Sequence, residues 1–294
     1  MKLRASIEAG GTKFVCAVSN QQGDIFQKTH FPTTTPDETL QQIKHFFSEF
    51  KQITHLGVGA FGPICLNTKD PHYGKILNTP KLSWRNFNLI NGLKEIFPNT
   101  HIMLETDVTI AAIGEKTLGA AKEIENFIYL TVGTGIGGAV FVNNQPIRGL
   151  LHPELGHIHL PKASMEVNSF NGICPSHHDC LEGLASGEAI KQRWQTSHPE
   201  NLPLDHPAWS LEAEYLAKAL HNYILIAAPE RIILGGGVMK QQHLFPMIRQ
   251  KVQQSLNQYI QHSSLIQDID QYIVPPQLQG DAGIKGGLIL TNQI

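Results

Sequence analysis

Cysteine is scarce in this sequence, and its placement argues against a disulfide-stabilised fold. The four cysteines, at positions 16, 65, 174 and 180, do not form the dense pattern of a small secreted domain. Cys16 and Cys65 lie in apolar, strand-like runs, where a thiol packs as a small hydrophobic group. We therefore expect buried, reduced thiols at these two positions and a cytoplasmic location.

The chain also lacks a large excess of charge and any long apolar run. Its 23 Lys and Arg nearly balance its 25 Asp and Glu, for a formal net charge of -2. This balance favours neither nucleic acid nor an anionic membrane as a partner. The longest apolar segment, 223–228, ends at Pro229 and is far too short to span a bilayer. The amino terminus leads directly into a strand-like run and shows no signal-peptide pattern.

What the sequence does contain is an alternation of strand-like and helix-like segments. Strand patterns that alternate with helix patterns predict an α/β architecture. A strand, glycine turn, strand pattern in residues 3–25 recurs in residues 127–147, which predicts a duplicated unit. The expected helices are 36–50, 89–97, 107–121, 211–227, 244–260 and a terminal helix from 281, and the remaining expected strands are 55–60, 101–105, 231–234 and 272–274.

Three glycine turns, at 9–13, 132–138 and 234–238, each follow an apolar strand pattern. Glycine lets backbone N–H groups turn toward a ligand and approach it closely, as in phosphate-binding loops. Thr12 and Thr134 add hydroxyl donors, and Lys13 adds a positive charge. Tight hairpins also need glycine, but three such turns at strand ends favour a nucleotide or phosphate site.

The second turn satisfies the dinucleotide fingerprint through Gly133, Gly135 and Gly138. That fingerprint should open a helix, whereas residues 139–142 are rich in β-branched and aromatic side chains and favour a strand. A Rossmann dehydrogenase is therefore disfavoured. The sequence also has no GxxxxGK[ST] segment, which disfavours a P-loop kinase.

Asp107 stands where a strand pattern gives way to a helix pattern. One interpretation is structural, because Asp is a favoured N-cap. The other is catalytic, because a carboxylate at a helix N-terminus stays ionised and can accept a proton from a substrate hydroxyl. Phosphoryl transfer depends mostly on positioning and charge neutralisation, so one such base and glycine cradles for phosphate would suffice.

A compact Cys-x-x-His-x-x-Cys segment predicts a metal site. Cys174, His177 and Cys180 supply the ligand types that tetrahedral zinc prefers, and His157 is the preferred fourth ligand. His178 and His159 remain alternatives for that position. Four protein ligands leave no open coordination position, so the zinc would be structural.

Glu154 lies three residues before His157 in the segment His-Pro-Glu-Leu-Gly-His. Its carboxylate is a candidate for hydrogen bonds to sugar hydroxyls. An exposed loop glutamate without a substrate role is the alternative.

Together these motifs resemble the ROK family of sugar kinases and, within it, the bacterial fructokinases. The resemblance runs nearly end to end. It rests on the segments 8–18, 61–63, 106–108, 132–137, 152–157, 174–180, 181–187 and 234–239.

The resemblance implies an actin/hexokinase-like, ribonuclease H-like fold with two lobes and duplicated β-hairpin/α units. Residues 1–117 with the C-terminal helix 281–294 would form one lobe, and residues 118–280 with the zinc-binding loop the other. The resemblance also implies a usually dimeric enzyme that transfers phosphate from ATP, with Mg²⁺, to the 6-hydroxyl of D-fructose. Mannose and glucose share most hydroxyls with fructose, so the preferred hexose stays open.

By the same likeness, Asp107 is the base, and Glu154, His157 and Gly62 contact the sugar. The zinc ligands are His157, Cys174, His177 and Cys180. The nucleotide-binding residues are Gly10, Gly11, Thr12, Lys13, Thr131, Gly133, Thr134, Gly135, Gly235, Gly236, Gly237, Val238 and Met239. A sugar-sensing regulator of this family is the alternative, disfavoured because such proteins carry a helix-turn-helix segment ahead of the first strand.

The chain departs from the usual family pattern in three places. Glu8 replaces the usual Asp of the first loop, as it does in the fructokinase branch. Thr109, Ile110 and Ala111 stand where Asn-Ala-Ala is usual, and Glu188 stands where fructokinases usually carry Pro. Because position 188 borders the nucleotide in this family, details of the adenine pocket depend on Glu188.

Overall fold

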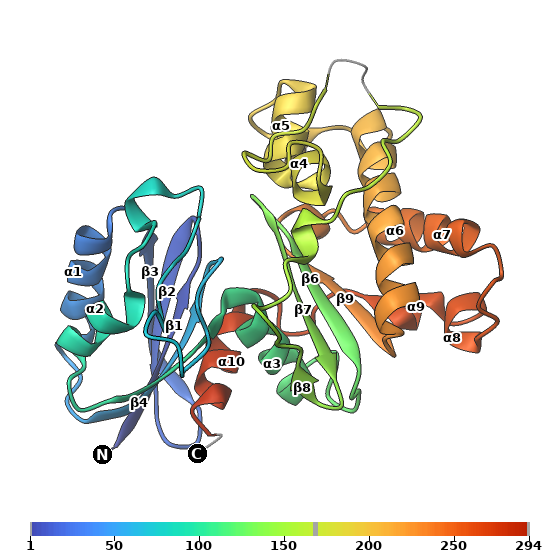
Figure 1. The fold of residues 1–294 in the computed structure, drawn as a ribbon. Helices are drawn as coiled ribbons and strands as arrows, with labels where there is room; N and C mark the ends of the chain where they lie inside the picture. Colours follow the sequence, from blue (N-terminus) through green and yellow to red (C-terminus); the bar gives the residue numbers. More distant parts are fainter. Residues whose placement is uncertain (1, 167–169, 293–294) are drawn as a thin grey trace. The chain divides into compact units, whose positions relative to one another are not determined.

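The computed structural model describes residues 2–166 and 170–292 and divides the chain into two compact units (Figure 1). Unit 1 comprises Met1–Lys122, Arg148–His152 and Gln277–Ile294, and unit 2 comprises Glu123–Ile147 and Pro153–Pro276. The chain therefore enters unit 1 three times, once through a segment of only five residues. Each unit contains its own five-stranded sheet.

The sheet of unit 1 has the strand order β3-β2-β1-β4-β5. β1, β2 and β3 form an antiparallel meander, whereas β4 and β5 add in parallel. The strands are β1 Leu3–Ala9, β2 Lys13–Ser19, β3 Ile25–Pro32, β4 Ile53–Ala60 and β5 His101–Thr106, and the helices are α1 Pro36–Phe47, α2 Leu89–Ile96, α3 Asp107–Leu118 and α10 Ala282–Leu290. Figure 1 shows α1 and α2 on one face of this sheet and α10 with α3 on the other.

The sheet of unit 2 repeats this order and these directions, as β8-β7-β6-β9-β10. Its strands are β6 Phe127–Val132, β7 Ile136–Val142, β8 Gln145–Pro146, β9 Arg231–Gly235 and β10 Ile273–Val274. Its helices are α4 Leu181–Ala185, α5 Gly187–Trp194, α6 Pro207–Ala227, α7 Leu244–Leu256, α8 Ser263–Ile266 and α9 Ile269–Tyr272. The predicted α/β architecture with a duplicated hairpin unit is confirmed.

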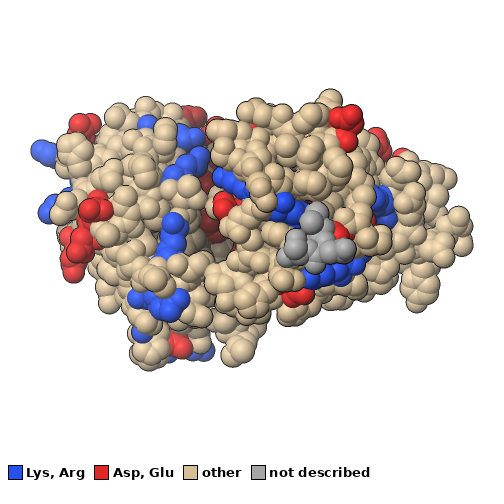
Figure 2. All heavy atoms as spheres, turned by 90° about the horizontal axis from the view of Figure 1, so that it is seen from above, with Lys and Arg blue, Asp and Glu red and all other residues tan. Residues whose placement is uncertain are grey.

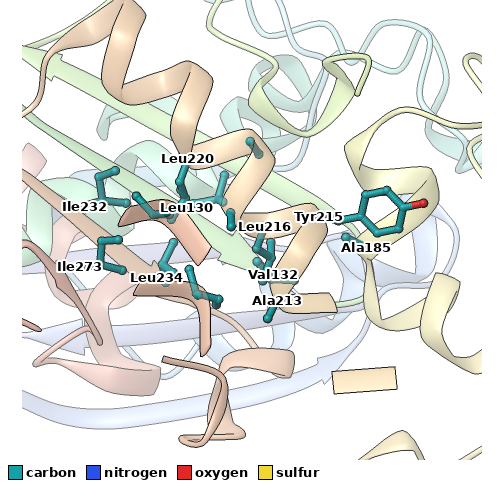
Figure 3. Close-up of a cluster of buried hydrophobic side chains, with 14 of the residues drawn as sticks. Leu130, Val132, Ala185, Ala213, Tyr215, Leu216, Leu220, Ile232, Leu234 and Ile273 are labelled. Atoms are coloured by element: carbon teal, nitrogen blue, oxygen red, sulfur yellow. The ribbon is translucent and has the colours of Figure 1, made fainter. Parts of the chain in front are cut away.

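Burial of hydrophobic side chains stabilises both units. In unit 1 the rings of Phe14, Phe61 and Trp84 pack together, and the indole N–H of Trp84 donates to the carbonyl of Thr34. In unit 2 the inner face of α6 covers the sheet: Figure 3 shows Leu216 and Leu220 beside side chains from β6, β9 and β10. Burial of each such large side chain stabilises the fold by about 1.5–3 kcal/mol.

α3 and α10 pack closely enough to exclude side chains at their crossing. A Cβ placed on Gly286 of α10 would overlap the carbonyl oxygen of Ile110 in α3, and one on Gly114 would overlap that of Ala282. Glycine at these positions therefore sets the separation of the two helices.

Several element boundaries differ from the sequence prediction. The long helix of unit 2 begins at Pro207 rather than 211, because Pro suits the first turn and the His206 side chain caps the helix. α7 ends at Leu256 rather than 260, since Asn257 and Gln258 adopt positive φ. The helix after Asp107 ends at Leu118, where Gly119 leaves the helical region. Of the expected terminal helix, residues 293–294 lie outside the described residues.

The expected buried thiols are confirmed, because Cys16 and Cys65 are buried and free. In the described parts of the chain, no helix combines the length and apolar character needed to cross a membrane. On the face drawn in Figure 2, acidic and basic side chains lie in small groups among larger uncharged areas.

Candidate active site

The first glycine turn joins β1 to β2 in unit 1. The N–H of Gly10 donates to the carbonyl of Lys13 at 3.0 Å, and the hydroxyl of Thr33 donates to the carbonyl of Gly10 at 2.7 Å. A Cβ on Gly10 would lie 2.9 Å from the Lys13 oxygen, so the turn requires glycine there. A Cβ on Gly11 would lie 3.6 Å from Cε of Lys81, which places a second lysine beside this turn.

Asp107 is the first residue of α3 and not its N-cap. Thr106 occupies the cap position, where its hydroxyl accepts the N–H of Thr109 at 3.1 Å. The capping interpretation of Asp107 is therefore wrong. The Asp107 carboxylate accepts the N–H of Val108 at 2.9 Å. Burial raises the pKa of Asp107 to about 6, although backbone hydrogen bonds oppose that rise.

A second carboxyl of unit 1, Glu8, interacts with Asp107. Burial and, to a smaller extent, the negative charge of Asp107 raise the pKa of Glu8 to about 7, although Lys13 and Lys28 act in the opposite direction. The two acids therefore share an environment in which a negative charge is costly. Such an environment favours groups that exchange protons near neutral pH.

The five-residue segment Arg148–His152 returns the chain to unit 1. Arg148 forms an ion pair with the buried carboxylate of Glu105, two residues before Asp107. Nε2 of His152 accepts the N–H of Ile64 at 3.3 Å, and the His152 ring lies beside Gly62. The segment that leads to Glu154 is thus anchored at both ends in unit 1.

The second and third glycine turns line one pocket of about 380 Å³ in unit 2. Gly236 has a φ of 93°, in the left-handed region that favours glycine, and its backbone packs against Val132 at the end of β6. The pocket has an apolar wall and a charged rim. Its lining residues are Gly133, Thr134, Gly187, Glu188, Ile190, Lys191, Pro199, Glu200, Trp209, Gly237, Val238, Lys240 and Gln241.

Thr131, Gly135, Gly235 and Met239 complete the predicted nucleotide-binding set in unit 2. Thr131 lies in β6, Gly235 ends β9 and Met239 is buried in the short helix that follows. Gly135 lies in the turn itself, where the N–H of Gly133 donates to its carbonyl at 2.9 Å. The second turn leads into β7, a strand, as expected for a chain that is not a Rossmann dehydrogenase.

His157, Cys174, His177 and Cys180 lie together, with one ligand atom from each within 4.8 Å of the others. Nδ1 of His157 lies 3.7 Å from Sγ of Cys174, 3.5 Å from Sγ of Cys180 and 3.4 Å from Nδ1 of His177. Tetrahedral zinc separates sulfur from nitrogen ligands by about 3.5 Å and two nitrogens by about 3.3 Å. The spacing and the donor set therefore fit zinc.

The alternative ligands lie outside this group. His159 faces Asp179 at 3.8 Å, and His178 is exposed with a φ of 54°. Glu154 is also exposed, directly before the short helix Leu155–His157 that carries a ligand of the cluster. Gly156 in that helix packs against the backbone of Ile136, which ties Glu154 and His157 to the start of β7.

A model of the ROK family matches residues 4–294. The chain belongs to the ROK family. It is 42% identical over 289 residues to a fructokinase from Pediococcus pentosaceus, covering 98% of this chain and 97% of that one. It is also 42% identical over 275 residues to a fructokinase from Lactococcus lactis subsp. cremoris, covering 93% and 91%.

The fold matches the crystal structure of a ROK family glucokinase from Streptomyces griseus in complex with glucose and AMPPNP. The TM-score is 0.79 at 23% identity, with 99% of this chain and 100% of that chain covered. The expected resemblance and the actin/hexokinase-like fold of ROK sugar kinases are both confirmed.

The structure accounts for two departures from the usual ROK pattern. Thr109 joins the N-terminal cap of α3, because its hydroxyl lies 2.7 Å from that of Thr106. Glu188 lines the pocket of unit 2, where its carboxylate interacts with Gln192 and Lys191 on the same helix. A charged side chain thus lines this pocket.

Sequence reasoning gave no role to three charged residues near these turns. They are Glu8 beside Asp107, Lys81 beside Gly11, and Glu182, whose carboxylate accepts the N–H of Ile136 at 2.8 Å. Lys81 and Glu182 lie far along the sequence from the turns that they contact. Only the folding of each unit brings Lys81 to Gly11 in unit 1 and Glu182 to Ile136 in unit 2.

Proposed function

We propose that this ROK protein is an ATP-dependent fructokinase that converts D-fructose to fructose 6-phosphate. The likeness to two fructokinases along almost the whole chain carries the proposal. Two features of the structure support it. Unit 1 contains an acid with a raised pKa that suits proton transfer, and unit 2 contains glycine turns around a pocket that suits a nucleotide.

Asp107 is the general base in this proposal. With a pKa of about 6, its carboxyl is mostly ionised at neutral pH, yet its affinity for a proton exceeds that of an ordinary aspartate. It would accept the proton of the fructose 6-hydroxyl as that oxygen attacks the terminal phosphorus of ATP. Glu154, His157 and Gly62 are the proposed sugar contacts.

The nucleotide would bind to the glycine turns. Backbone N–H groups of Gly10–Thr12, Thr131–Gly135 and Gly235–Met239 suit phosphate oxygens, with Lys13 as a neutralising charge. The 380 Å³ pocket suits a base and ribose, since Ile190, Pro199 and Trp209 give it an apolar wall. Mg²⁺ accompanies ATP in such chemistry and neutralises phosphate charge. Glu8 is a carboxylate that fits as its ligand.

His157, Cys174, His177 and Cys180 would hold one structural zinc ion. Four protein ligands leave no position for substrate, so these residues serve to order the loop that carries them. His157 would then take part in sugar binding only through its position and its remaining nitrogen.

We also infer a cytoplasmic homodimer. The free, buried cysteines support a reducing compartment. The exposed apolar side chains of Leu225 and Ile226, near the end of α6, support an interface there. Light scattering on the purified protein would give twice the chain mass, and a mass of one chain would contradict the dimer.

The deciding experiment measures ADP release from ATP and Mg²⁺ with a panel of hexoses. Fructose should give the highest kcat/KM, and the product should be fructose 6-phosphate. A higher kcat/KM with mannose or glucose would show that this hexose, and not fructose, is the preferred substrate. Binding of a hexose without any ADP release would favour the sugar-sensing alternative.

A further inference from the structure

We propose that Lys81 is a further catalytic residue, which binds the terminal phosphate of ATP at the β1–β2 turn. The inference rests on the proposed function and names a charge that would act on the transferred group. Lys81 lies 70 positions after Gly11 in the sequence, so spacing along the chain does not connect the two. Both residues belong to unit 1, as does the proposed base Asp107.

The β1–β2 turn has hydrogen-bond donors that no protein group uses. Its carbonyl groups are occupied, because the hydroxyl of Thr33 donates to Gly10 at 2.7 Å and the N–H of Thr33 donates to Thr12 at 3.0 Å. Among the described residues, the N–H groups of Gly11 and Thr12 donate to no protein acceptor. Two successive free N–H groups in a turn form a concavity that attracts an anion.

The side chain of Lys81 reaches this turn. Its Cε lies 3.6 Å from the Cβ position of Gly11. Since Nζ is bonded to Cε, the ammonium group lies at the turn, within reach of an anion that the free N–H groups hold. A phosphate oxygen in that position would receive hydrogen bonds from the backbone and a charge-assisted one from the lysine.

A buried tryptophan fixes the backbone of Lys81. Lys81 is the N-cap residue of the short helix Leu82–Trp84, and its carbonyl accepts the N–H of Trp84 at 2.9 Å. Trp84 is fully buried, and its indole N–H donates to the carbonyl of Thr34 at 2.7 Å. Thr34 directly follows Thr33, which holds the carbonyl groups of the turn. One short segment therefore positions both the turn and the helix that begins after Lys81.

The two lysines near the turn differ in their partners. Burial and the charge of Asp107 raise the pKa of Glu8, and Lys13 opposes that rise, so the charge of Lys13 is already partly offset within unit 1. Lys81 is half-buried, and no carboxylate of the described residues forms an ion pair with it. Its charge therefore remains for a ligand.

The proposed reaction needs a positive charge at this place. As O6 of fructose bonds to the terminal phosphorus, its proton passes to the carboxylate of Asp107. The bond from that phosphorus to the bridging oxygen breaks, and its electron pair leaves with ADP. The other three oxygens of the transferred group remain negative throughout, and a fixed cation beside them stabilises the transition state. Lys81 supplies this cation and exchanges no proton.

The experiment begins with the wild-type protein. It should release ADP from Mg-ATP and fructose, and calorimetry should detect binding of Mg-ATP and of Mg-ADP. Absence of nucleotide binding, or of ADP release with every hexose, would contradict the proposed function itself. Both results are separate from the properties of Lys81.

Lys81→Met is then compared with the wild type and with Lys75→Met. Methionine keeps an unbranched side chain and removes the charge. Lys75 is a matched control because it is a half-buried lysine of the same loop-rich segment in unit 1, and its backbone pairs with Asn88 rather than with a glycine turn. Lys81→Met should lose about 10²-fold in kcat, whereas Lys75→Met should match the wild type.

Nucleotide binding identifies the phosphate that Lys81 contacts. Lys81→Met should bind Mg-ATP more weakly and Mg-ADP, which lacks the terminal phosphate, as the wild type does. An equal loss of affinity for both nucleotides would overturn the proposal, and so would an unchanged kcat. A higher KM for fructose at a normal kcat would also overturn it, since that result would make Lys81 a sugar contact.

Lys81→Arg separates the effect of charge from that of shape. The guanidinium group keeps the positive charge in a larger, planar form, so this variant should have a higher kcat than Lys81→Met. A kcat no higher than that of Lys81→Met would contradict the role of the charge. If circular dichroism shows that Lys81→Met does not fold, Lys81→Gln replaces it in the same measurements, because glutamine also removes the charge.

Discussion

A catalytic carboxyl whose pKa lies near neutrality makes the activity of an enzyme depend on pH in that range. Burial raises the pKa of Asp107 to about 6, so protonation should remove the base as the pH falls through that value. We expect kcat/KM for fructose to be constant above about pH 7 and to fall tenfold per unit below about pH 5. Asp107→Asn should fold normally and lose at least about 10²-fold in kcat.

Glu8 supplies the control for this assignment, because its pKa is raised to about 7 and it interacts with Asp107. Glu8→Gln should lower kcat, because it removes the proposed Mg²⁺ ligand, but the acid limb that belongs to Asp107 should remain near pH 6. If the limb disappears in Glu8→Gln, or if Asp107→Asn retains near-normal turnover, Asp107 is not the base.

Glu212 in α6 illustrates the cost of an unpaired buried acid. Both carboxylate oxygens are buried without a hydrogen-bond partner, and burial raises the pKa of Glu212 well above the value of 4.5. Above pH 4.5 the unfolded chain loses this proton while the folded chain keeps it, so the free energy of unfolding falls as the pH rises. Below that pH both states are protonated and the penalty vanishes.

Glu212→Gln has no proton to lose and should remove this decline. Its Tm relative to the wild type should increase between about pH 5 and pH 8. The slope, rather than the absolute Tm, is the readout, because an amide at this site adds a cost that does not depend on pH. An unchanged slope would show that Glu212 is ionised in the folded protein.

At the residue scale, a functional site can be predicted from the sequence when its residues lie close together along the chain. Cys174, His177 and Cys180 share one short segment, so their proximity follows from spacing alone. Asp107 is prominent because a strand meets a helix there. Glu182 gave no such signal, since its partner Ile136 lies 46 residues away and only the packing of α4 on the turn joins them.

At the scale of elements, periodicity located the strands and helices, and local backbone chemistry decided where they end. α7 stops at Asn257, which adopts the left-handed conformation. The sequence has no glycine at that point, so it gives no signal that the helix ends there. Two of the glycine turns line one pocket in unit 2, an arrangement that follows from the parallel pairing of β6 with β9 and is invisible in either turn alone.

The α3–α10 crossing offers a test at this scale. Gly286→Ala would place a methyl group against the carbonyl of Ile110, so the helices must separate. Overpacking of this kind destabilises a protein by about 1–3 kcal/mol, and occasionally more. Denaturant unfolding should show that loss for Gly286→Ala. Gly280→Ala is the control, because no atom lies within 4 Å of its Cβ position, and an equal loss there would contradict the packing argument.

At the scale of the whole molecule, one sheet order appears twice, and the proposed functions divide between the two copies. Unit 1 holds Asp107 and Glu8, whereas unit 2 holds the pocket and the Cys/His cluster. The echo of the two hairpins in the sequence was sufficient to predict the duplication. The return of residues 148–152 to unit 1 was not predictable, because it depends on the pairing of Arg148 with Glu105 across 43 positions.

This division predicts which unit is destabilised when the metal is removed. The four proposed ligands and the residues that α4 contacts belong to unit 2, so removal of the metal by a chelator should destabilise that unit. Hydrogen exchange measured by mass spectrometry should accelerate in peptides that cover residues 173–187 and 133–136. Peptides from α3 and α10 should keep their protection, because that helix pair is packed within unit 1. Faster exchange in α3 and α10 would show that the cluster stabilises the whole chain, and no change at residues 133–136 would show that the turn holds its shape without metal.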